Sequence, residues 1–124
     1  MKDIKFRAWE KKLKEMITVS TVDFNKEMIN TDSLWRYFHE VELMQYTGLK
    51  DKNGTEIYEG DIVVHYDGEL TFKAIVEWDY WSWYLKGVIP EDNFQIEDVT
   101  DRNVSDVQII GNVYEHPELL EVNE

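Results

Sequence analysis

Three histidines, His39, His65 and His116, are the side chains of this sequence best suited to bind a metal ion. They lie far apart along the chain, and none has a second histidine four residues away, the spacing that places two ligands on one face of a helix. A metal site would need ligands brought together from distant segments with help from carboxylates. The sequence therefore predicts ordinary surface or hydrogen-bonded histidines and no metal centre.

Carboxylates are the next candidates for chemistry, because the chain has 26 Asp and Glu residues. Glu59 and Asp61 flank a glycine, and close pairs also occur at 91–92 and 97–98. General acid–base catalysis needs two carboxyl groups in different environments, one of them shielded from water. Neighbouring acids on a loop are usually solvated, and residues 51–56 lack the ligand spacing of a calcium loop. We expect no catalytic pair.

Motifs for nucleophilic catalysis and for cofactors are missing from the sequence. There is no cysteine, no Gly-x-Ser-x-Gly motif and no glycine-rich phosphate or dinucleotide loop. Turns account for all six glycines. We predict that the protein is not an enzyme and binds no cofactor.

The most unusual segment has five aromatic residues within positions 78–84. So many rings cannot all enter one small core, so some must lie at a surface or an interface. Glu77 and Asp79 interleave with the rings and Lys86 is an isolated cation, which disfavours stacking on nucleic-acid bases. We predict a tight hairpin turn whose aromatic residues pack and contact another subunit, with a partner-protein site and a nucleic-acid or sugar site as alternatives. The candidate interaction surface is Trp78, Tyr80, Trp81, Trp83 and Tyr84.

The formal net charge of −13 is unevenly distributed along the chain. Residues 1–52 hold 10 Lys and Arg and 9 Asp and Glu, whereas residues 53–124 hold 3 and 17. Phosphate binding needs a cationic surface, so we do not expect nucleic acid as a partner. The N-terminal end is locally basic, and we interpret it as a solvated hairpin with lysines on its exposed face. The alternative is that this charge directs partners or head-to-tail contacts between copies of the chain.

The elements that must carry these residues are predicted to be mostly strands. Apolar and polar residues alternate over 4–9, and β-branched residues are frequent over 15–24 and 107–114. Residues 34–39 are predicted as a short helix after a polar cap, with an extended loop as the alternative. Short strands separated by turn signals are typical of a small antiparallel barrel or sandwich. We therefore predict a mainly β fold with an N-terminal β-hairpin region and at most short helices; a β-rich α+β fold is the alternative.

Turn signals punctuate the central segment. Asn53-Gly54 is the clearest, because this pair tolerates positive φ at both central positions of a hairpin turn. Glycines permit turns and bulges, and Asp and Asn side chains bond to nearby backbone. The candidate structural turn residues are Gly48, Asp51, Asn53, Gly54 and Gly60.

Length and composition favour a globular protein. With 124 residues and a 43% hydrophobic fraction, we expect one domain over 1–124. The alternative is an N-terminal β region over 1–46 and an acidic, barrel-like region over 54–124. No apolar run approaches the length of a membrane span and no secretory signal is recognisable, so we expect a cytoplasmic protein.

Four segments cover both ends and the middle of the chain: Lys5–Trp9, Leu43–Gly54, Ile57–Val63 and Val107–Leu120. Together they resemble the YopX family of small bacteriophage and prophage proteins. The resemblance implies a mostly β, phage-associated protein in the bacterial host cell, and it supplies no catalytic residues. Residues Tyr58–Val63 also resemble the first strand of SH3-like barrels, which is a likeness of fold alone.

Together these observations predict a non-enzymatic phage accessory protein that acts by protein–protein contact and forms a homo-oligomer. A host or phage protein is the other expected partner. One alternative is an acidic mimic of nucleic acid that inhibits a host DNA-binding protein, based on the charge of residues 53–124. The further alternative is direct nucleic-acid binding through the basic N-terminus and the aromatic hairpin.

Overall fold

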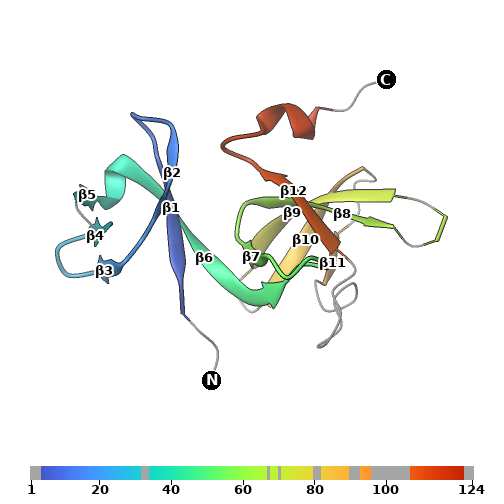
Figure 1. The fold of residues 1–124 in the computed structure, drawn as a ribbon, viewed down its shortest axis with the longest axis horizontal. Coiled ribbons are helices and arrows are strands. Elements are labelled where there is room, and N and C mark those ends of the chain that lie inside the picture. Colours follow the sequence, from blue (N-terminus) through green and yellow to red (C-terminus); the bar gives the residue numbers. More distant parts are fainter. Residues whose placement is uncertain are drawn as a thin grey trace. The chain divides into compact units, whose positions relative to one another are not determined.

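Strands dominate the computed structural model, which describes residues 4–31, 34–66, 68–69, 71–79, 82–89, 93–95 and 107–121. The helical segments among these residues are short 3-10 helices (Figure 1). The predicted mainly β fold with short helices is confirmed. By its internal contacts the chain divides into two compact units, Met1–Tyr46 and Thr47–Glu124, and each is described by itself.

The first unit is built from two small antiparallel sheets. Its elements are β1 (Phe6–Glu10), β2 (Glu15–Thr18), β3 (Thr21–Asp23), β4 (Met28–Asn30), β5 (Trp35–Tyr37), the 3-10 helix η1 (Phe38–Glu40) and the first part of β6 (Val41–Lys50). Strand β1 lies between β2 and β6, and β4 lies between β3 and β5. The alternation over β1 gives it one buried face, because Ala8 is buried whereas Arg7 and Trp9 are only partly covered.

The core of the first unit joins the two sheets. Ala8 from β1, Ile29 from β4 and Val41 from β6 are buried together. Partly buried side chains surround them, among them Ile17 from β2 and Phe38 from η1. Burying one face of each sheet against the other removes apolar surface from water.

Residues 34–39 do not form the predicted helix. Thr31 and Leu34 close a turn, with the Thr31 N–H donating to the Leu34 carbonyl at 2.8 Å. The chain then pairs with β4 as β5, in which Arg36 lies opposite Ile29. The helical pattern of apolar residues is outweighed by strand pairing, because a short isolated helix gains little in water.

The second unit contains a curled, five-stranded antiparallel sheet that forms a half-barrel. Its elements are the end of β6, β7 (Glu56–Tyr58), β8 (Asp61–Tyr66), β9 (Thr71–Asp79), β10 (Ser82–Ile89), β11 (Asn93–Gln95), β12 (Val107–Asn112) and the 3-10 helix η3 (Pro117–Leu120). The order across the sheet is β11-β10-β9-β8-β12, so the last strand of the sequence pairs with β8 (Figure 1). Strand β7 lies beside β6.

One face of the half-barrel carries the core of the second unit. Val63 lies opposite Ala74, and Val76 lies opposite Leu85. All four are buried with Ile57 and Val107 in a single cluster. The C-terminal turn is held to β9 by Lys73, whose Nζ donates to the Leu119 carbonyl at 2.6 Å. No helix in the described part of the chain is long and apolar enough to span a bilayer.

Candidate functional site

The aromatic hairpin is formed by β9 and β10, and its two described tryptophans form a cross-strand pair. Trp78 lies directly opposite Trp83, with their ring centroids 4.9 Å apart and their planes tilted by 60°. Trp83 packs against the core of the second unit, whereas Trp78 is 50% exposed. We call this pair the tryptophan face. Tyr80 and Trp81 lie outside the described residues.

Tyr84 points to the opposite face of the same hairpin. It lies opposite Glu77, and its hydroxyl donates a hydrogen bond to the Glu77 Oε2 at 2.6 Å. This partner satisfies a phenolic hydroxyl that is only partly exposed. Among the described members of the candidate interaction surface, Trp78 is therefore the one that offers a large apolar area to a partner.

The candidate turn residues lie in the segment that joins β6, β7 and β8. Gly48, Gly54 and Gly60 have φ angles of 87°, 83° and 86°, which side-chain-bearing residues rarely adopt. Asn53 is not among the described residues with positive φ, so the turn is not the type with two positive φ angles. Its stability comes instead from Asp51, whose Oδ1 accepts hydrogen bonds from the backbone N–H groups of Asn53 and Thr55.

Asp51 also connects this turn to the edge strand of the half-barrel. Its Oδ2 accepts a hydrogen bond from the Ile109 N–H at 3.1 Å, and the Lys52 N–H donates to the Val107 carbonyl at 2.9 Å. Asp51 is only 6% exposed, so its charge is stabilised by backbone donors rather than by water. These bonds occupy backbone groups of β12 that an unprotected edge would offer to another strand.

Substituting Gly54 with alanine is expected to destabilise the protein through backbone strain alone. No atom lies within 4 Å of the position that a Cβ would take, but φ is +83° there. The left-handed conformation costs about 1–2 kcal/mol for most side chains, and less for asparagine. In urea unfolding, the wild-type protein should therefore have the highest free energy of unfolding, Gly54→Asn a lower one and Gly54→Ala the lowest. Equal stability of all three would show that the turn changes its conformation.

The three histidines are separate and have different surroundings. His39 stacks on Tyr37 with ring centroids 5.4 Å apart, and His65 stacks on Phe72 at 6.3 Å. The His116 Nδ1 accepts a hydrogen bond from the Asn112 N–H at 3.2 Å. Among the described residues, no three His, Cys, Asp or Glu side chains are grouped as metal ligands.

A second exposed aromatic surface, which the sequence did not reveal, lies on the outer face of β3, β4 and β5. Trp35 is 47% exposed and Tyr37 is 50% exposed, while Arg36 between them points inward toward Glu10. The strand alternation that exposes both rings was hidden by the helical interpretation of residues 34–39. The signal that could have revealed it is the alternation of aromatic and polar residues over Trp35, Arg36 and Tyr37.

Fold and candidate surfaces define a β-rich protein of two compact units, whose described residues show exposed aromatic rings and no metal-ligand cluster. The chain belongs to the YopX protein family, which matches it over residues 5–121. The family resemblance found in the sequence is thereby confirmed. Nothing in this membership indicates catalysis.

Two solved structures are similar to this chain over essentially their whole length. Protein EF1440 from Enterococcus faecalis is 27% identical with a TM-score of 0.74, and the match covers 98% of this chain and 100% of that one. Protein yopX from Bacillus subtilis is 21% identical with a TM-score of 0.64, and the match covers 100% of both chains. The second likeness shows a shared fold. No curated protein matches the chain.

Proposed function

We propose that this protein is a non-enzymatic interaction module that self-associates, and that it serves a bacteriophage or prophage as an accessory protein. The observation that carries the proposal is Trp78, a large apolar side chain that stays half exposed although Trp83 beside it packs on the core. Exposed tryptophans are strongly enriched among the residues that dominate binding energy at protein interfaces. The phage role rests on the sequence resemblance to phage proteins.

The buried acids of the second unit support an interaction role over a catalytic one. Asp51 and Asp61 are both buried, and both accept hydrogen bonds from backbone N–H groups of their own turns. Such carboxylates hold the fold together and are not available to a substrate. An acidic mimic of nucleic acid would therefore have to use the other carboxylates of the second unit.

Self-association is tested by light scattering coupled to size-exclusion chromatography over a wide range of concentrations. We expect oligomers in the wild-type protein, and a dissociation constant at least tenfold weaker after Trp78→Ser, because hot-spot tryptophans contribute about 2 kcal/mol or more. Trp35→Ser is the matched control, since Trp35 is exposed to a similar extent on a strand of the first unit. A wild-type protein that is monomeric at every concentration would contradict self-association. Equal effects of both substitutions on the dissociation constant would indicate nonspecific association.

A further inference from the structure

The turn between β1 and β2 is a rigid, preorganised projection. Glu10 is buried at its base, and its Oε2 accepts the Leu13 N–H while its backbone carbonyl accepts the Lys14 N–H at 2.8 Å. Arg36 lies on the other side of the same carboxylate, with its Nε 4.0 Å from Oε1. A loop that is already ordered loses little conformational entropy when it binds.

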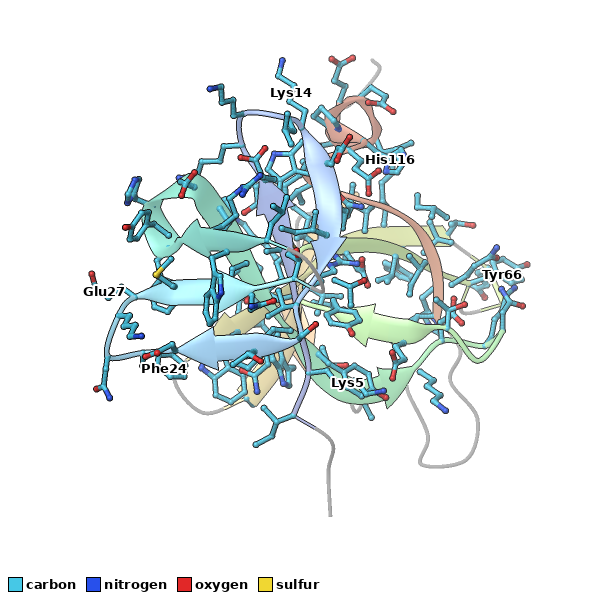
Figure 2. All side chains as sticks on the ribbon, turned by 60° about the vertical axis from the view of Figure 1, so that its left-hand side comes forward. Lys5, Lys14, Phe24, Glu27, Tyr66 and His116 are labelled. Carbon is cyan, nitrogen blue, oxygen red and sulfur yellow. The ribbon has the colours of Figure 1, made fainter. Side chains whose placement is uncertain are left out.

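This turn presents two lysines on either side of an apolar residue. Lys12 and Lys14 are exposed, and neither forms an ion pair within the part of the chain that the structure describes. Leu13 between them is 56% exposed. Lys11 differs, because its Nζ is held by the His39 carbonyl and the Glu42 carboxylate, each at 3.3 Å. We call Lys12, Leu13 and Lys14 the lysine tip. Figure 2 shows Lys14 where β1 turns into β2.

The net negative charge of the protein resides in its second unit. Residues 1–46 hold 8 Lys and Arg and 8 Asp and Glu, whereas residues 47–124 hold 5 and 18. The lysine tip is therefore attracted to the second unit of another copy, and this attraction weakens as salt screens it.

The tryptophan face has the chemistry that the lysine tip needs. A half-exposed indole binds an ammonium group over its ring and also offers apolar area to a leucine. Trp78 belongs to the second unit, whose excess of acidic residues attracts cations. The chain already uses the same interaction within its first unit, where the Lys5 Nζ lies 5.5 Å from the Tyr46 ring centroid.

We propose that the lysine tip of one copy docks on the tryptophan face of a second copy. This inference rests on the proposed self-association and specifies the two surfaces that make it. Because the surfaces differ, each copy has one of each, and the contact is heterologous rather than two-fold symmetric. Repetition of a heterologous contact produces a ring or a linear chain of copies.

Mixing two variants tests this arrangement directly. Lys12→Glu/Lys14→Glu removes the tip and keeps the tryptophan face, whereas Trp78→Ser does the reverse. Each variant, measured separately, should be monomeric at concentrations where the wild-type protein associates. Its dissociation constant for self-association should be at least tenfold weaker. An equimolar mixture should form a 1:1 dimer and nothing larger, because just one competent contact remains. Glutamate is compatible with the tip backbone, since Lys14 has a φ of 57° and Glu27 adopts 53° in the same chain.

Lys50→Glu/Lys52→Glu is the matched charge control. Both lysines are exposed in the second unit, so the net charge changes equally while the tip stays intact. We expect this variant to associate at least as tightly as the wild-type protein, and circular dichroism should show all variants folded. Association of the tip variant as tight as wild type, or no dimer in the mixture, would overturn the docking proposal while self-association stands. A monomeric wild-type protein would overturn both proposals.

Discussion

Replacing Asp51 with alanine is expected to lower the free energy of unfolding by about 3 kcal/mol, a large effect for a single turn residue. The carboxylate accepts three backbone hydrogen bonds, two from its own turn and one from Ile109 on β12. Water can replace the carboxylate as the acceptor for the N–H groups of Asn53 and Thr55, which are exposed residues. The Ile109 N–H is partly buried and would lose its acceptor. Urea unfolding followed by circular dichroism measures the loss.

Asp51→Asn separates the two roles of this carboxylate. The asparagine keeps one oxygen for the Asn53 and Thr55 N–H groups, but it turns an amide N–H₂ toward the Ile109 N–H. We expect a loss of about 1–2 kcal/mol, between the wild-type protein and the alanine variant. If asparagine were as stable as aspartate, the bond to β12 would contribute nothing, and the account of Asp51 as the link between turn and edge strand would be wrong.

The second large effect is expected at Gly111, where alanine should cost about 2 kcal/mol. A Cβ at this position would lie 2.7 Å from the His116 Nδ1 and 3.0 Å from the His116 Cβ. The contacts with the ring atoms are the closest, since the His116 Cγ would lie 2.8 Å away, so the imidazole has to move. Displacing the imidazole also removes the acceptor of the Asn112 N–H. The measured quantity is the midpoint of urea unfolding.

A double-mutant cycle with His116→Ala tests this explanation. Truncating His116 alone should cost about 1 kcal/mol for the lost hydrogen bond, and it also makes room for a Cβ on residue 111. The double variant should therefore be more stable than the sum of the two single losses predicts, by about 1 kcal/mol or more. Strict additivity would show that the glycine is needed for some reason other than the imidazole beside it.

The mainly β class was predictable because strand formation here depends on patterns read over a few residues. Alternation over residues 4–9 and β-branched residues over 107–114 correspond to β1 and β12. Residues 34–39 show the limit of such short-range prediction. Their apolar spacing suits a helix, but Trp35–Tyr37 pair with β4 as a strand. Partners that lie elsewhere in the chain decide such ambiguous segments.

For the candidate surfaces, too, the sequence predicts a general property and the strand register decides which residues have it. The excess of rings over residues 78–84 predicts that some must be exposed, but not which ones. The strand register decides this, because it places Trp83 against the core and Trp78 beside it in solvent, and it turns Tyr84 to the other face. The exposed rings of Trp35 and Tyr37 depend on register as well, because their outward orientation follows from β4–β5 pairing.

By itself, then, the sequence determined the β class and the uneven charge, which follow from composition and short-range pattern, and its segments carried the resemblance to the family. Tertiary structure alone decided what Asp51 does, because its third hydrogen bond reaches Ile109, 58 residues away. It also decided that the lysine tip is held rigid by Glu10 and Arg36, which meet across 26 residues of sequence. Local chemistry sets what each segment can form, whereas burial and long-range hydrogen bonds select which side chains support the fold and which remain exposed for a partner.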